Sequence, residues 1–376
     1  MKVFHCDSCG NLLFFENTTC INCNRTVAYL PQAGVVASLE PAGDGEWTAT
    51  SAGADAAHYR LCRNYTDAQV CNWAIDVADD TPFCASCRLT DVIPDTTAPG
   101  TREAWYRLEV AKRRLVYSLQ SLALPLKSRA EDPSGGVAFQ FMADPVPDAD
   151  GIGPRVMTGH DNGIITINIA EADDAERERR RASMHEPYRT VLGHMRHEIG
   201  HFYWDRLIRD TDELAAFRRL FGDEQRDYSE ALKEHYAVGA PADWSSRFIS
   251  AYASSHPWED WAETWAHYLH MFDTLDTAAA CGVSLRPKRR DEPSLVKAPD
   301  VGGSRTMPFA RLIDGWFPLT YMLNNLNRGL GLADAYPFVL ADPILEKLEF
   351  VHDVIDRFVP GAAARPGPIR AQTQPL

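Results

Sequence analysis

The sequence predicts an α+β fold in which a small β-rich head precedes a mainly helical domain. Eight of the nine cysteines fall within the first 87 residues, among short apolar runs that Gly, Pro, Asp and Asn interrupt, as is typical of short strands. The segment 93–101 (IPDTTAPGT) has two prolines and a glycine, which is typical of a linker. From Tyr188 onward the chain is mainly helical in pattern. The predicted parts are a head at 1–95, a second domain at 102–362 and a disordered tail at 363–376.

The composition is that of a globular protein, with 45% hydrophobic residues and a formal net charge of −14. So acidic a surface argues against binding to nucleic acid or to anionic membranes. The N-terminus lacks the apolar core of a signal peptide, and no apolar run approaches the roughly 18 residues of a transmembrane helix. We therefore expect a cytoplasmic protein, in which paired cysteines bind metal more often than they form disulfides.

The first four cysteines form two CxxC knuckles, Cys6–Cys9 and Cys20–Cys23, separated by ten residues. Two tight turns at this spacing can present four thiolates at the corners of a tetrahedron, about 2.3 Å from a zinc ion. The residues between the knuckles, 10–19, are expected to form a short hairpin. Together these features predict a zinc ribbon.

A second quartet consists of Cys62, Cys71, Cys84 and Cys87 and contains a single CxxC. The alternatives are a second four-thiolate zinc site and four scattered thiols. We favour zinc, because a small head with few long apolar runs gains folding free energy from metal ligands. Both quartets would be closed, structural sites. Cys281 stands apart and is expected to be a small buried apolar residue.

The second domain begins with apolar residues at helical spacing over 104–122, before Pro125. Two strand candidates follow at 137–143 and 163–172. The run 173–181 (DDAERERRR) alternates acids with arginines, which indicates a solvated helix or loop rather than a basic recognition patch.

The stretch HMRHEIGH contains the motif HExxH, formed by His197, Glu198 and His201. Histidines at i and i+4 of a helix lie one turn apart on one face and can bind a single zinc ion, with the glutamate beside the metal-bound water. His194 lies about 10.5 Å along the helix from His201, so we expect it in the second shell or at the rim of the cleft. The alternative is a histidine-rich surface helix without metal.

A catalytic zinc needs a third protein ligand, and the segment 255–272 (SHPWEDWAETWAHYLHMF) is the best source. Pro257 suits the first turn of a helix that Ser255 or His256 would cap. One carboxylate of the pair Glu259 and Glu263 would bind zinc, and the other would orient a ligating imidazole. Two stripes are expected on this helix: an aromatic stripe that packs into the core, with Trp258, Trp261 and Trp265, and an opposite stripe that faces the metal cleft, with Glu259, Glu263, His267 and His270.

At these residues the sequence resembles the zinc-dependent gluzincin metallopeptidases. Within them it is similar to the bacterial putative zinc-binding metallopeptidase family that carries an N-terminal zinc ribbon. The resemblance extends over nearly the whole chain, through CDSC…CINC, VCNW…FCASCRLTDVIPD, AKRRLVYSL, YRTVLGHMRHEIGHFYWDRLI, WEDWAETWAHYLH and AYPFVLADPILEKLEFVHDVI. It implies a zincin-like second domain and peptidase activity.

The segment AYASSHPWEDWAE is also similar in pattern to the peptidase domain of anthrax lethal factor. This resemblance implies that Glu259 is the third zinc ligand, that Tyr252 stabilises the oxyanion and that Glu263 lies in the second shell. The chain departs from that pattern in a longer gap after HExxH, which holds residues 212–239.

We therefore expect three Zn²⁺ ions, one catalytic and two structural. Glu198 would act as general base on the zinc-bound water, and the strand at 164–169 would pair with an extended peptide or protein substrate. One alternative is a non-catalytic scaffold, in which the head recognises a protein partner and the HExxH zinc is structural or vestigial. Another is a self-processing or highly restricted peptidase.

Overall fold

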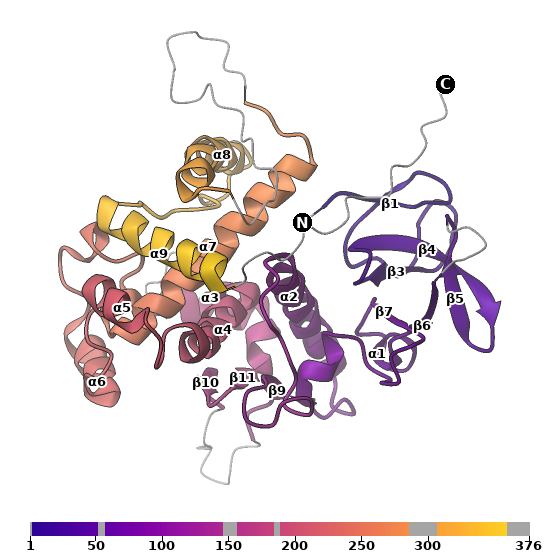
Figure 1. Cartoon of the computed structure of the whole chain (residues 1–376), viewed down its shortest axis with the longest axis horizontal. Coiled ribbons are helices and arrows are strands. Elements are labelled where there is room, and N and C mark those ends of the chain that lie inside the picture. The colour runs from indigo at the N-terminus through magenta and orange to yellow at the C-terminus, as the bar shows by residue number, and fades with distance from the viewer. Residues whose placement is uncertain (1, 52–56, 146–155, 184–188, 286–306, 359–376) are drawn as a thin grey trace.

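A β-rich N-terminal region lies beside a larger helical body (Figure 1). The computed structural model describes residues 2–51, 57–145, 156–183, 189–285 and 307–358, so the predicted tail at 363–376 lies outside the described residues. The predicted order, a β-rich head and then a mainly helical domain, is confirmed.

Each of the two CxxC knuckles of the first quartet occupies the turn of its own antiparallel pairing. The strands β1 (Phe4–His5) and β2 (Leu12–Leu13) are antiparallel and flank the first knuckle. An antiparallel bridge between Thr19 and Thr26 flanks the second. The predicted hairpin within residues 10–19 is therefore wrong, because β2 pairs backwards across the knuckle. Gly10, with a φ of +75°, makes the tight turn that this pairing requires.

The rest of the head is an antiparallel sheet in the order β3-β4-β5-β6-β7. One face of this sheet carries a small apolar cluster of its own, which includes Leu30, Leu39 and Tyr59. The elements are β3 (Val27–Leu30), β4 (Val35–Gly43), β5 (Glu46–Ala49), β6 (His58–Leu61), the short helix α1 (Arg63–Thr66) and β7 (Ala74–Asp76).

The head and the helical body share one hydrophobic core. The ring of Tyr117, on α2 (Thr101–Ser121), lies 5.4 Å from that of Phe15 and 6.0 Å from that of Tyr29 in the head. Cys87, the last cysteine of the second quartet, lies in a short 3-10 helix, η1 (Cys87–Leu89), which leads directly into a strand that pairs with the sheet of the second domain. Loss of order in this part of the head should therefore reach the helical body.

The sheet of the second domain has four strands in the order β10-β11-β9-β8, and β8 joins it from residues 90–92, within the predicted head. Strand β11 pairs antiparallel with β10 and parallel with β9, and β8 is parallel to β9. Because β11 is paired on both sides, the expectation that residues 164–169 offer a free edge to a peptide is wrong, and β10 is the edge strand on that side. The elements are β8 (Thr90–Val92), β9 (Ala138–Met142), β10 (Gly159–Asp161), β11 (Ile164–Asn168), the 3-10 helix η2 (Ile169–Ala172) and α3 (Asp174–Ser183).

Two helices at the centre of the body carry the HExxH motif and the tryptophan-rich segment. Helix α4 (Val191–Leu207) packs on α7 (Pro257–Ala280), and their backbones approach closely at Gly200. A Cβ atom on Gly200 would lie 3.1 Å from the Cα of Ala262, which explains why a glycine stands inside the motif. The indole of the fully buried Trp261 donates to the carbonyl of Gly200 at 2.9 Å. This contact sets HExxH directly against the segment expected to supply the third ligand.

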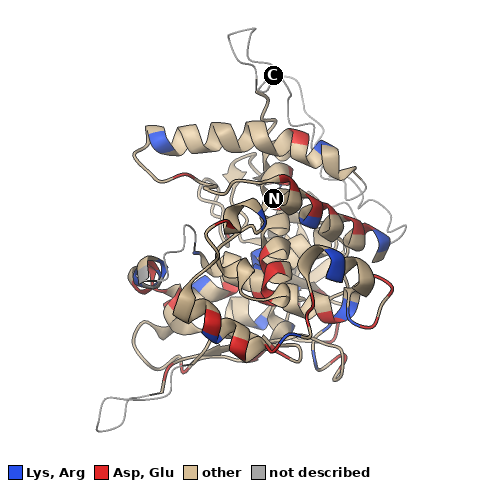
Figure 2. Cartoon of the chain, turned by 90° about the vertical axis from the view of Figure 1, so that its left-hand side faces the viewer, with Lys and Arg blue, Asp and Glu red and all other residues tan. Residues whose placement is uncertain are grey.

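The other helices of the body are α5 (Leu214–Phe221), α6 (Tyr228–Val238), the 3-10 helices η3 (Trp244–Ser246) and η4 (Tyr252–Ser254), α8 (Phe309–Gly329) and α9 (Asp342–Phe358). On this side of the molecule, Lys and Arg residues are interspersed with Asp and Glu (Figure 2). Among the described residues, no helix combines the length and apolar character needed to cross a bilayer.

Two local predictions are wrong. Cys281 is exposed, because it caps the C-terminus of α7 where the helix leaves the core. The stripe opposite the tryptophans divides along its length: Glu259 and Glu263 face α4, whereas Nδ1 of His267 lies 2.8 Å from the hydroxyl of Tyr336. His270 also lies against the Tyr336 ring. The far end of the stripe therefore packs on the segment after α8.

Candidate metal centres

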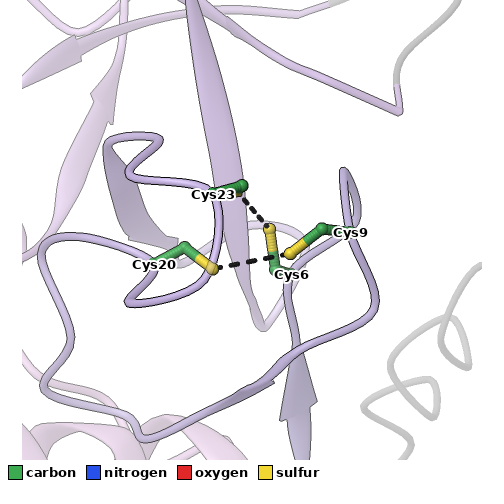
Figure 3. A group of neighbouring side chains, drawn as sticks. All are labelled: Cys6, Cys9, Cys20 and Cys23. Carbon is green, nitrogen blue, oxygen red and sulfur yellow. Dashed lines mark hydrogen bonds between the residues drawn. The ribbon is translucent and has the colours of Figure 1, made fainter.

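The first quartet brings its four sulfur atoms together at the surface of the head. The Sγ atoms of Cys6 and Cys23 are 3.7 Å apart and those of Cys9 and Cys20 are 3.6 Å apart (Figure 3). A disulfide would place sulfurs about 2.05 Å apart, whereas four thiolates at about 2.3 Å from a zinc ion lie about 3.8 Å from one another. The spacing fits a tetrahedral zinc site and excludes disulfides.

The second quartet has the same geometry and lies deep inside the molecule. The Sγ atoms of Cys71 and Cys84 are 3.7 Å apart, and all four ligand atoms, with those of Cys62 and Cys87, lie within 4.8 Å of one another. All four residues are buried. Scattered thiols would not converge in this way. Arg113 of α2 is buried nearby and donates to the carbonyl of Val70, so a cation from the second domain lies beside this group of thiols.

The third cluster joins the HExxH helix to the first turn of α7. The Nε2 atoms of His197 and His201 lie 3.2 Å apart. Oε2 of Glu259 is 2.9 Å from Nε2 of His197 and 3.6 Å from Nε2 of His201. Pro257 at the first helical position and the His256 side chain, which accepts from the Trp258 amide, fix where α7 begins and so where Glu259 points.

These three donors fit a zinc ion. A tetrahedral ion with ligands at about 2.0–2.1 Å separates its donor atoms by about 3.3 Å, close to the three distances observed. Although Oε2 of Glu259 is buried, it accepts no hydrogen bond of acceptable geometry from the described residues. A buried carboxylate oxygen is costly unless a cation meets it. Two imidazoles and one carboxylate are the ligand set of a catalytic zinc site, which keeps one position for water or substrate.

Glu263 lies one turn after Glu259 and contacts the opposite edge of the first imidazole. Its Oε1 is 2.7 Å from Nδ1 of His197, and its Oε2 accepts from the hydroxyl of Ser250 at 2.7 Å. Burial by itself raises the pKa of Glu263, but the hydrogen bond and positive charge of His197 lower it to about 2. An ionised carboxylate on Nδ1 leaves Nε2 of His197 directed at the metal position.

Glu198 is buried beside this cluster. Burial raises the pKa of its carboxyl above the ordinary value, and the positive charges of His197 and His201 act in the opposite direction. A raised pKa makes a carboxylate a stronger base at neutral pH. Glu198 is thus a buried carboxyl that lies beside the three convergent donors and is not one of them.

Tyr252 and His194 occupy different sides of the centre. The Tyr252 ring lies 6.0 Å from that of His197, which places it at the metal cluster. Nδ1 of His194 lies 3.4 Å from Oε2 of Glu171, so the polar contact of His194 is with the 3-10 helix η2. The structure thus brings Tyr252 to the candidate ligands and turns His194 toward the second-domain sheet.

Three residues at the centre, Ser250, His160 and Tyr228, were not predicted from the sequence, and Trp258 was wrongly predicted to pack into the core. Ser250 fixes Glu263, and the edge-strand residue His160 lies 6.1 Å from the His201 ring. The ring of Trp258 lies 4.0 Å from that of His201, so Trp258 covers a candidate ligand although it shares a helical stripe with core tryptophans. The hydroxyl of Tyr228 donates to Oε1 of Glu259 at 2.6 Å. No local motif marks Ser250, His160 or Tyr228 as site residues. The one signal in the sequence concerns Tyr228, which lies in the segment 212–239 that departs from the lethal-factor pattern.

Comparison with known proteins shows the family to which the chain belongs. A family model described as "Putative zinc-binding metallo-peptidase" matches residues 101–354, and a model described as "zinc-ribbon domain" matches residues 3–98. The chain belongs to this metallopeptidase family. An uncharacterised protein of Mycobacterium tuberculosis and another of Mycobacterium bovis are each 44% identical to it over 362 residues, which cover 96% of this chain and 97% of theirs. No solved structure gives a significant match.

In this member of the family, Glu263→Gln should weaken zinc binding at His197 by about 10- to 100-fold, the usual effect of losing a residue that orients a metal-ligating histidine. The amide keeps the size of the side chain but removes the charge that faces Nδ1. Zinc affinity measured by chelator competition checks this. Glu230→Gln, on the exposed surface of α6, is the matched control and should bind zinc as the wild type does. Equal affinity in both variants would contradict the role assigned to Glu263.

Proposed function

We propose that the protein is a zinc-dependent peptidase of the gluzincin type, with one catalytic and two structural zinc ions. His197, His201 and Glu259 would hold the catalytic ion, and the two cysteine quartets would hold the others. One observation carries the proposal: Glu198 lies buried next to a cluster with three convergent donors, one fewer than tetrahedral zinc takes. The cysteine sites, by contrast, offer four thiolates each, which closes them to chemistry.

The residues around the centre would divide the reaction between them. When bound, zinc supplies Lewis acidity and lowers the pKa of a coordinated water toward about 7. Glu198 would take the proton of the attacking water and pass it to the leaving amine. Tyr252 would donate a hydrogen bond to the developing oxyanion. The edge strand β10, which packs against α4, would align an extended peptide through its backbone.

The chemistry of the cysteines supports one cellular compartment for the protein. Both quartets bind zinc only as reduced cysteines, and reduced thiols persist in the cytosol. We therefore assign the protein to the cytoplasm, where its substrates would be peptides or proteins.

A second candidate function, binding without catalysis, is supported by the surface of the head. Three apolar side chains around the first zinc ribbon are strongly exposed: Leu12 at 66%, Phe14 at 80% and Ile21 at 83%. Large apolar side chains that are exposed near a zinc ribbon are candidates for contact with a protein partner. In this reading the head recognises the partner and the His197 centre is structural.

A peptide library incubated with the zinc-loaded protein and analysed by mass spectrometry tests the proposal. We expect cleavage at a restricted set of bonds, loss of cleavage after chelation and recovery when zinc is restored. Cleavage that persists in the chelated protein would contradict a zinc mechanism. A library left intact by the loaded protein would favour the binding function instead.

A further inference from the structure

Helix α6 belongs to the segment by which this chain departs from the lethal-factor pattern. Its first residue, Tyr228, bonds to a candidate metal ligand, and its His235 lies 5.9 Å from the ring of Tyr252. Ala231 is the buried residue of this helix, so α6 has little apolar contact to hold it in place. The Asp227 side chain accepts from the Glu230 amide and fixes where the helix starts. This start places Tyr228, the first residue of α6, over the beginning of α7.

Tyr228 enters the centre between aromatic neighbours and ends on a metal-ligand candidate. Its ring lies 5.3 Å from that of His256 and 5.8 Å from that of Trp258. Its hydroxyl donates to Oε1 of Glu259 at 2.6 Å, the short distance of a charge-assisted bond to a carboxylate. Tyr228 is 38% exposed, whereas Glu259 is 1% exposed, so the bond joins a surface helix to a buried ligand.

The two tyrosines of the centre make different contacts. The hydroxyl of Tyr228 donates directly to Oε1 of Glu259. Tyr252 lies instead against the imidazole of His197, with the ring centroids 6.0 Å apart.

The two oxygens of Glu259 are thereby made unequal. Oε1 is occupied by the phenol, and Oε2 is left facing the two Nε2 atoms. The torsion that exchanges the oxygens of a glutamate is broad and soft, so packing alone holds it weakly. Without the phenol, Oε1 would be a buried acceptor that has lost its donor, and the carboxylate would rotate to recover one.

We infer that Tyr228 is a positioning residue of the metal centre, which clamps Glu259 through Oε1 so that Oε2 alone is presented to the ion. The inference rests on the proposed metal centre but not on peptidase activity. It gives the segment 212–239 a function, because α6 carries the residue that orients the third ligand. It also separates the two tyrosines, since Tyr228 hydrogen-bonds to Glu259 whereas Tyr252 lies against the ring of His197.

Zinc affinity tests the clamp directly. The zinc-loaded protein is dialysed against increasing dipicolinate, and the ion that the wild type holds and His201→Ala lacks is assigned to this centre. We expect Tyr228→Phe to weaken that ion by about 10- to 100-fold. Tyr252→Phe leaves the bond between Tyr228 and Glu259 in place, so its zinc affinity should stay within a few-fold of that of the wild type. Tyr321→Phe, which removes an exposed phenol on α8, should have no effect.

A double-mutant cycle shows whether the effect passes through Glu259. In a Glu259→Ala background, Tyr228→Phe should cost no further affinity. An equal loss in both backgrounds, which a general folding defect would also produce, overturns the inference. Wild-type affinity in Tyr228→Phe overturns it while leaving the metal centre intact. A wild type without an ion that depends on His201 overturns the inference and the proposed function together.

Discussion

Glu198→Gln should keep all of the bound zinc and lose about 10²- to 10⁴-fold in peptide turnover, the usual contribution of a general base. Glutamine has nearly the shape of glutamate, and Glu198 is not among the three convergent donors, so the ion keeps its ligands. The amide cannot accept the proton of the attacking water. Zinc content and the cleavage rate of a peptide found in the library experiment are the two measurements.

The informative comparison is with Glu263→Gln, because both variants remove one buried charge from the same centre. Glu198→Gln should change turnover at unchanged zinc affinity. Glu263→Gln should change zinc affinity first, and excess zinc should restore much of its turnover. A Glu198→Gln protein that cleaves at the wild-type rate would show that another group takes the proton, and the assigned mechanism would be wrong.

The sites that follow from local spacing were predictable from the sequence. CxxC knuckles and HExxH place their ligands within one turn of the backbone, so the sequence separation alone determines which side chains converge. The third ligand was harder, since Glu259 and Glu263 are one turn apart and share a face of α7. The resemblance to lethal factor predicted which of the two is the ligand. In the structure, Glu259 lies at the Nε2 atoms and Glu263 lies at Nδ1 of His197.

Helical periodicity predicted which side of α7 each side chain occupies. It did not predict which residue the side chain contacts at a given point along the helix. Trp258 and Trp261 lie on one stripe of α7, yet Trp261 enters the core while Trp258 covers His201. The difference arises because Trp258 stands in the first turn, opposite the end of the HExxH motif. In the same way, the exposed Cys281 shows that a helix end can leave the core that its middle enters.

Contacts between distant segments could not be predicted. Tyr228 and Glu259 are separated by 31 residues, and α6 has neither a motif nor a continuous apolar face that would fix its position. The pairing of β11 on both sides was equally hidden, because a strand pattern does not show which strands flank it. Both contacts depend on the tertiary arrangement, which single-sequence patterns do not encode.

The two cysteine quartets should differ sharply in what their loss does to the whole protein. Cys84→Ser should unfold the head and destabilise the helical body. Structural zinc sites contribute about 10–16 kcal/mol of binding free energy in isolated fingers, comparable to the roughly 5–15 kcal/mol that stabilises a typical domain. Cys84 is buried in the core shared by both parts, and Arg113 of α2 would lose the thiolates beside it.

Cys23→Ser is the matched variant in the first quartet, where Cys23 is half-buried at the edge of the head. It should loosen the two knuckles while α2, α4 and α7 stay folded and the His197 centre keeps its zinc. Helical circular dichroism on heating, with zinc content for each variant, separates the two cases, and Cys281→Ser at an exposed cysteine is the control. Equal losses of helix in Cys84→Ser and Cys23→Ser would contradict this division. A structural zinc buried between the parts would hold the helical body in shape, whereas the outer zinc would shape only the surface that the head presents.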